Sequence, residues 1–254
     1  MRGRVLACAA GSAVLLGCWS DGSREAPQSA IGRATPRMPA CTSYQRPLGG
    51  TDWAYAAVPR KHLVAAHARP HGKKLATFGR RNENGFVTVF GVVGEVLGRN
   101  CAPSWYRVQL PMRPNGATGY VQVSDVVVVQ LRTRIEVDLS ARRIQVFRAG
   151  RSVLVTRAGV GRPGTPTPTG RYYVNQLLLS DDPDGVFGPG GVGISAFAPR
   201  LEQWPQGGPI AIHGTDQPAT IGRAASLGCL RVPNHVVRWF FRNVPAGTPV
   251  LIRP

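Results

Sequence analysis

The chain has 254 residues, of which 43% are hydrophobic, enough for one large domain or two small ones. It carries 31 Lys and Arg against 13 Asp and Glu, a formal net charge of +18, and only three of the basic residues are lysines (Lys61, Lys73 and Lys74). Such a charge attracts anionic polymers, but the arginines are spread along the chain without interleaved aromatic patches, which disfavours nucleic acid as the partner and leaves anionic cell-wall polymers open.

Residues 1–18 are expected to be an export signal. MRGR supplies a positively charged start, and the apolar run VLACAAGSAVLLGC that follows is too short to span a bilayer. The run ends in Leu15-Leu16-Gly17-Cys18, which resembles a bacterial lipobox, in which the cysteine is lipidated and becomes the mature N-terminus. Leu16 is bulkier than the usual residue there, and an ordinary signal peptide is the alternative. Either signal predicts an exported protein of the cell envelope, and a lipid on Cys18 would anchor it to the outer face of the cytoplasmic membrane.

Export gives meaning to the five cysteines. Cys8 would leave with the signal and Cys18 would carry the lipid. Because paired thiols outside the cytoplasm tend to oxidise, we predict a disulfide between Cys41 and Cys101. Cys229 is then unpaired, and catalysis is the sharpest reason for an exported thiol to stay free.

Residues 19–50 are rich in Ser, Pro, Gly, Arg and Ala without hydrophobic periodicity, which predicts a flexible tether. Residues 51–130 alternate short apolar runs with Gly, Pro and Asn turns, which predicts a small all-β domain. The stretch WYRVQLP…NGATGYVQVSDV resembles the last strands of bacterial SH3-like domains, which implies a small barrel that binds the wall or acts as a spacer. His62, His67 and His71 lack Cys or acidic partners at ligand spacing and are interpreted as surface residues, so no metal is expected.

Residues 131–254 are predicted to form a mostly-β domain with a single helix. The segment RIEVDLSARRIQVFRAGRSVLVTRAGVG predicts a three-stranded meander with turns at residues 140–142 and at Ala149-Gly150. Further strands are expected at GRYYVNQLLL, VGISAF, GPIAIHG and GTPVLIRP. A helix is expected after Pro233, with Asn234 as its cap and with one apolar face formed by Val236, Val237, Phe240 and Phe241.

The stretch AASLGCLRVPN places Cys229 without an acid or base beside it in sequence. A free thiol has a pKa of about 8.5, so a nucleophilic cysteine needs a base within hydrogen-bond reach. His213 ends the apolar strand PIAIHG sixteen residues earlier, and the loop between them could fold back, whereas His235 opens the helix and is expected to be exposed. A lone histidine on an apolar strand is more often a core residue, but the unexplained free thiol favours a Cys229–His213 pair.

Two separated motifs resemble those of the YkuD-type L,D-transpeptidases, and the resemblance covers about residues 131–254. IAIHGTDQPATIGRAASLGCLRV is similar to the family's histidine-glycine, loop and Ser-His-Gly-Cys-x-Arg/Asn signature. GVGRPGTPTPTGRYYV (159–174) is similar to its Thr-Pro-Thr-Pro-x-Gly strand entry, whose prolines would shape the wall of the site. Leu227 stands where the family usually has a histidine, so any polar contact of that histidine is lost.

The resemblance implies a β-sandwich catalytic domain that forms peptidoglycan cross-links between the third residues of stem peptides. Cys229 would form a thioester acyl-enzyme, with His213 as the base and the Gly214 backbone carbonyl as the third group. The backbone N–H groups of Gly228 and Cys229 would form the oxyanion hole. No cofactor is expected.

Two further residues are expected to bind substrate. Ser226 would order the loop or touch the stem peptide, and Arg231 could pair with a stem-peptide carboxylate. An L,D-carboxypeptidase is the nearest enzymatic alternative, because excluding water decides transfer over hydrolysis. A non-catalytic wall-binding lipoprotein is the alternative from another class.

Overall fold

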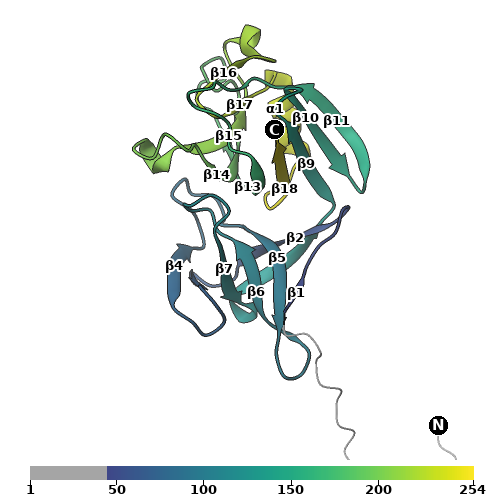
Figure 1. Cartoon of the computed structure of the whole chain (residues 1–254), viewed down its shortest axis with the longest axis vertical. Coiled ribbons are helices and arrows are strands. Elements are labelled where there is room, and N and C mark those ends of the chain that lie inside the picture. Colours follow the sequence, from purple (N-terminus) through teal and green to yellow (C-terminus); the bar gives the residue numbers. More distant parts are fainter. Residues whose placement is uncertain (1–44) are drawn as a thin grey trace, which may run out of the picture. The chain divides into compact units, whose positions relative to one another are not determined.

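The computed structural model describes residues 45–254, which form two eight-stranded sheets and a small two-stranded one (Figure 1). The predicted signal peptide with Cys18, most of the predicted tether and Cys41 lie outside the described residues. Within residues 45–254, no helix combines the length and the apolar character that a membrane span needs.

The first sheet takes up residues 45–131 and has the strand order β4-β3-β7-β6-β5-β2-β8, with β1 paired to β5. Its core lies around Phe90, Val108 and Val121. The mostly-β prediction is confirmed, whereas the SH3-like identity of this part stays a prediction. The elements are β1 (Gln45–Pro47), β2 (Ala54–Pro59), β3 (Leu63–His67), β4 (Lys74–Gly79), β5 (Phe90–Leu97), β6 (Pro103–Gln109), β7 (Thr118–Gln122), the 3₁₀ turn η1 (Val123–Asp125) and β8 (Val126–Leu131).

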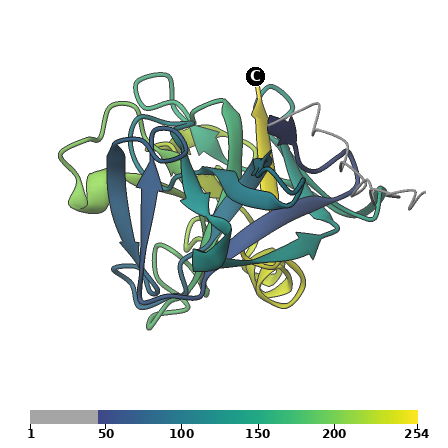
Figure 2. The same ribbon diagram turned by 90° about the horizontal axis from the view of Figure 1, so that it is seen from below.

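The second sheet has the order β11-β10-β9-β18-β13-β14-β15-β17 (Figure 1). It carries the core of the C-terminal half, and its yellow strand β18 runs to the C-terminus in Figure 2. Its strands are β9 (Thr133–Asp138), β10 (Arg143–Arg148), β11 (Arg151–Arg157), β13 (Gly170–Leu179), β14 (Gly190–Phe197), β15 (Pro209–His213), β17 (Leu230–Arg231) and β18 (Pro249–Arg253). Strands β12 (Val160–Gly161) and β16 (Ala224–Ser226) form the two-stranded sheet, and the 3₁₀ turns are η2 (Pro205–Gly207) and η3 (Pro218–Thr220).

The turn between β10 and β11 in the three-stranded meander follows from the conformation of its two residues. Arg148 pairs with Arg151, which leaves Ala149 and Gly150 as a two-residue connection. Their φ angles are +48° and +79°, the left-handed conformation that matches the twist of the flanking strands in a tight hairpin. The predicted turn at this dipeptide is therefore confirmed.

Helix α1 (Asn234–Asn243) follows the cysteine and buries Val236, Val237 and Phe240 in the core of the second sheet. The prediction that Asn234 caps it is wrong, because Pro233 occupies the cap position and no side chain caps the helix. Asn234 Oδ1 instead accepts the backbone N–H of Thr215 at 2.8 Å. The start of the helix is thereby tied to the loop that follows β15.

Cys101 is disulfide-bonded, and because Cys41 lies outside the described residues, the pairing of these two stays a prediction. His67 and His71 pack edge-on against the buried Trp105 ring, with centroid distances of 5.4 and 5.1 Å. The surface interpretation is therefore wrong for His67, which is half-buried, while His62 and His71 are exposed. Within residues 45–254, no three His, Cys, Asp or Glu side chains are grouped so that they could hold a metal ion.

Candidate active site

Cys229 and His213 are brought together by the parallel pairing of β15 and β17. Ile212 lies opposite Leu230 and His213 opposite Arg231, so Cys229 stands directly before β17, beside the strand that His213 ends. The loop between the two residues returns the chain to the edge of β15. The sequence allowed the loop between His213 and Cys229 to fold back, and in the structure it does so.

The imidazole of His213 is buried, with 5% of the residue exposed, and its orientation is fixed from one side. Nδ1 donates a hydrogen bond to the Gly214 carbonyl oxygen at 2.5 Å, which is the orienting contact that the family resemblance implies. The neutral ring then carries its proton on Nδ1 and leaves the lone pair of Nε2 to accept one. The ring of Phe187 stands edge-on to the imidazole, at a centroid distance of 5.1 Å.

Burial keeps both groups of the pair uncharged at neutral pH. It lowers the pKa of His213 from 6.5 to about 4; the Gly214 hydrogen bond raises this pKa and the positive charge of Arg231 lowers it further. Burial also raises the pKa of the Cys229 thiol, against smaller lowering effects of the Ala211 backbone N–H and of Arg231. The resting pair is therefore thiol and imidazole rather than thiolate and imidazolium.

The sulfur of Cys229 is held by the backbone of β15. Sγ lies 4.0 Å from the Pro209 carbonyl oxygen, to which the thiol donates, and the backbone N–H of Ala211 donates to the sulfur. Among the hydrogen bonds of the described part of the chain, none joins Cys229 Sγ to His213. The thiol thus rests on the edge of the strand that His213 ends.

The turn before Cys229 is built around Ser226 and Gly228. Ser226 Oγ donates to the Cys229 carbonyl at 2.6 Å and accepts the Gly228 N–H at 3.1 Å. Gly228 has φ +124°, and a Cβ at this position would lie 2.9 Å from Ile210 Cδ1, so only glycine fits.

The turn bears on two sequence predictions. Ser226 is 2% exposed and orders the turn, which is the first of the two roles expected for it, and its contact with substrate stays a prediction. The Gly228 N–H donates within the turn, so it does not serve the oxyanion hole in this conformation. The Cys229 N–H stays as the predicted donor.

Threonines of the TPTPT motif (165–169) hydrogen-bond to the backbone of this turn, a role that sequence reasoning missed. Thr167 Oγ1 donates to the Gly228 carbonyl at 2.8 Å and accepts the Gly161 N–H at 2.9 Å. Thr165 Oγ1 donates to the Ser226 carbonyl at 3.1 Å. The alternation of threonine with proline was the available signal, because it points hydroxyls to one side of an extended segment.

Replacing Thr167 with valine is expected to lower the free energy of unfolding by about 2–4 kcal/mol, because two buried backbone groups lose their partner. Thr167 is 4% exposed, so water cannot replace the hydroxyl. Thr165→Val removes one bond at a half-buried position and serves as the matched control, with a smaller expected loss. Denaturant unfolding of the three proteins measures this, and equal losses for the two variants would contradict the assignment.

Arg231 lies beside the pair in the β15–β17 register. Its Nη1 donates to Thr220 Oγ1 at 3.2 Å and to Gln217 Oε1 at 3.5 Å, while its buried Nε has no partner within the described residues. These contacts hold the loop between His213 and Cys229. The predicted pairing with a substrate carboxylate stays a prediction.

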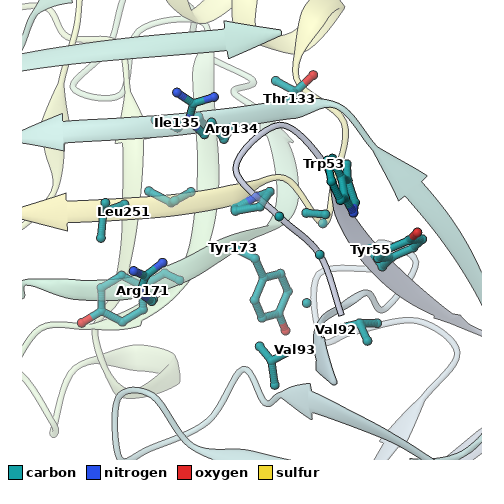
Figure 3. A pocket seen from close by; sticks show the side chains of 18 of the residues that line it. Trp53, Tyr55, Val92, Val93, Thr133, Arg134, Ile135, Arg171, Tyr173 and Leu251 are labelled. Carbon is teal, nitrogen blue, oxygen red and sulfur yellow. The ribbon is translucent and has the colours of Figure 1, made fainter. Parts of the chain in front are cut away.

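A cavity lies away from this pair. It has a volume of about 610 Å³ and is lined from both large sheets, among others by Trp53, Tyr55, Arg134 and Tyr173 (Figure 3). Neither Cys229 nor His213 lines it. The Cys229–His213 pair is therefore found at the two strand ends and not in this cavity.

Comparison with known proteins identifies the C-terminal half. Residues 132–252 match the family model of the L,D-transpeptidase catalytic domain, YkuD. Residues 132–252 are therefore similar to the YkuD-type L,D-transpeptidase catalytic domains and are here called the transpeptidase domain. The transpeptidase domain contains His213, Cys229 and the TPTPT motif, so all the contacts described above for the site belong to it.

Relatives of the transpeptidase domain are found in bacteria. YkuD of Bacillus licheniformis, named as an L,D-transpeptidase, is 34% identical over 121 residues, which are 48% of this chain and 66% of that protein. YkuD of Bacillus subtilis is 34% identical over 118 residues, 46% of this chain and 64% of that protein. The match thus spans slightly less than two thirds of either relative. The solved catalytic domain of the Enterococcus faecium L,D-transpeptidase is 29% identical with a TM-score of 0.35, and the match covers 48% of this chain and 96% of that one.

At position 227 the transpeptidase domain differs from the signature that it resembles, because it has a leucine where the family usually has a histidine. It is half-buried in the turn between Ser226 and Gly228. The hydrogen bonds of the turn run through Ser226, Thr165 and Thr167 and do not need a polar side chain at position 227. The leucine is therefore compatible with an ordered nucleophile turn.

Proposed function

We propose that this protein is a peptidoglycan L,D-transpeptidase that joins the third residues of two stem peptides through a thioester on Cys229. The observation that carries the proposal is the strand-end pair: His213, with Nδ1 held by the Gly214 carbonyl, ends the strand beside which Cys229 lies. A base oriented by a third group next to a nucleophile is the arrangement that acyl transfer needs.

In the first step, Cys229 Sγ attacks the carbonyl carbon of the amide between the third residue and D-alanine. The S–C bond forms as the thiol proton passes to His213 Nε2. The C–N bond then breaks, and the imidazolium gives that proton to the leaving D-alanine amine. Because both groups start uncharged, proton transfer accompanies the attack instead of preceding it.

In the second step, the side-chain amine of another stem peptide attacks the thioester. Its N–C bond forms, the S–C bond breaks, and the amine proton returns through His213 to the sulfur. The Cys229 N–H would stabilise the oxyanion in both steps, and losing one such donor typically costs about 3 kcal/mol in the barrier.

The proposal includes export, a lipid on Cys18 and work at the cell wall outside the membrane. The formal net charge of +18 supports it, because anionic wall polymers would concentrate around such a protein. Residues 45–131 would then bind the wall or hold the transpeptidase domain at a distance from the membrane.

Purified tetrapeptide muropeptides test the proposal directly. We expect release of D-alanine together with a cross-linked dimer, detected by mass spectrometry of the products. Release of D-alanine without a dimer would make the protein an L,D-carboxypeptidase, in which water takes the acyl group. A folded protein that releases no D-alanine would favour the non-catalytic wall-binding alternative.

A further inference from the structure

The hairpin that joins β14 to β15 forms one wall of the nucleophile site. Its outgoing strand supplies the Pro209 carbonyl and the Ala211 N–H, the two backbone groups that hold Cys229 Sγ. Ile210, between them, packs behind the Gly228 backbone. The position of this strand therefore sets the position of the sulfur.

The tip of the hairpin leaves the regular β14–β15 ladder. The β14–β15 register breaks between Gly193 and Phe197. At its tip, Gln206, Gly207 and Gly208 have φ angles of +57°, +74° and +68°, a run of left-handed residues. Three consecutive residues in this conformation do not extend a ladder. The tip is closed by backbone bonds of its own, such as the Ala198 N–H to the Gly208 carbonyl at 2.8 Å, and contacts from outside add to these.

Those contacts come from the first sheet, from the β6–β7 connection at residues 110–117. Arg113 Nη2 donates to the Ala198 carbonyl at 2.7 Å and to the Gly207 carbonyl at 2.8 Å, so one guanidinium bridges both arms of the hairpin. Its plane also lies over the Phe197 ring, 5.4 Å from the centroid. Hydrogen bonds from a charged donor to partly buried carbonyls are among the stronger ones in proteins.

Asn115 holds the same hairpin at its first residue. Its Oδ1 accepts the Phe197 N–H and its Nδ2 donates to the Phe197 carbonyl, both at 2.8 Å. The amide thus pairs both backbone groups of Phe197, the residue that lies opposite Pro209 of β15. Both residues are half-buried, so water competes poorly for these bonds.

We propose that Arg113 and Asn115 are positioning residues, which hold the β14–β15 hairpin in the conformation that acylation of Cys229 requires. The first sheet then helps to position the catalytic residues, in addition to linking the transpeptidase domain to the proposed lipid anchor. The inference rests on the proposed function, because acylation is the step it names.

Gln109 provides a matched control within the same β6–β7 region. Its Nε2 donates to the Arg171 carbonyl at 2.8 Å, a contact of the same kind between the two sheets. Arg171 lies at the start of β13, where it pairs with Leu251 of β18 and not with the hairpin. Gln109→Ala therefore removes an inter-sheet bond without touching the wall of the site.

The experiment measures acylation of the full chain by a carbapenem, following both the limiting rate constant at saturation and the final adduct yield by intact mass. For Arg113→Ala and Asn115→Ala we expect the limiting rate constant to fall about tenfold or more, because small misplacements of reacting groups cost that much. The half-saturating concentration and the final yield should stay unchanged, and Gln109→Ala should stay within about twofold of the parent. A variant that merely unfolds in part would lose yield instead of rate.

Rates for Asn115→Ala equal to those for Gln109→Ala would overturn the inference. If the parent protein is not acylated at all, the proposed function fails, and hydrogen exchange then decides the inference separately. In that case we expect faster exchange of the backbone amides of residues 197–211 in Arg113→Ala and Asn115→Ala but not in Gln109→Ala. Unchanged exchange in this segment would overturn it.

Discussion

Replacing Cys229 with alanine is expected to abolish acylation by a carbapenem and to stop D-alanine release, a loss of at least about 10³-fold. The sulfur is the nucleophile of the proposed thioester, and the hydrogen bonds around it come from the backbone of β15, which the substitution does not change. Intact-mass spectrometry with peptide mapping measures the adduct and places it on the peptide that contains residue 229.

Cys229→Ser is the control for shape, since the hydroxyl keeps nearly the same size. Both variants should unfold at nearly the same denaturant concentration as the parent. A Cys229→Ala protein that still carries the adduct, or still produces cross-linked muropeptides, would refute the assignment of the nucleophile.

His213→Gln is expected to lower the acylation rate by about 10²–10⁴-fold, because glutamine can donate to the Gly214 carbonyl but cannot accept the thiol proton. The parent protein should keep its activity down to mildly acidic pH and lose it as pH falls through about 4, the pKa to which burial lowers His213. Stopped-flow or quenched acylation across this pH range measures both effects.

The same pKa predicts how stability depends on pH. The folded pKa of about 4 lies below the ordinary 6.5, so between these values the unfolded chain binds more protons than the folded one. The contribution of His213 to stability is therefore present above about pH 6.5 and is lost as pH falls toward 4, a change of about 3 kcal/mol. His213→Gln should remove this part of the pH dependence.

His235→Gln is the matched control, because His235 is an exposed histidine of the same domain, on helix α1. It should leave the acylation rate and the pH dependence of unfolding as they are in the parent. An equal effect of the two substitutions on the acylation rate would remove His213 from the role of base.

Local patterns predicted much of the C-terminal half. Alternating apolar residues and the Ala149-Gly150 dipeptide gave the β9–β10–β11 meander, and the helical spacing of Val236, Val237 and Phe240 gave α1. These features depend on neighbours in sequence, where side-chain period and turn chemistry act directly. The cap of α1 was predicted wrongly because the Asn234 side chain bonds to Thr215, a residue from another part of the chain.

At the site, residue types were predictable but several roles were not. A free cysteine and a histidine at a strand end indicated the pair, and its motifs indicated the family. Ser226 was expected to order the loop or to touch substrate, and only the folded turn shows that its hydroxyl does the first. Thr165 and Thr167 act through contacts 61 residues apart in sequence, and the alternation of threonine with proline indicates only that their hydroxyls share a side, not what they bind.

The sequence by itself determined which groups could do chemistry here, namely an unpaired thiol, an imidazole and a glycine-containing turn, because these are properties of residue type and order. Only the tertiary structure decided where those groups lie and which of them are charged. Parallel pairing of β15 with β17 puts the sulfur beside the base, and burial makes both groups neutral. The Arg113 and Asn115 contacts likewise join segments more than eighty residues apart. Desolvation and long-range hydrogen bonds arise from packing, so they exist only once the two sheets have formed.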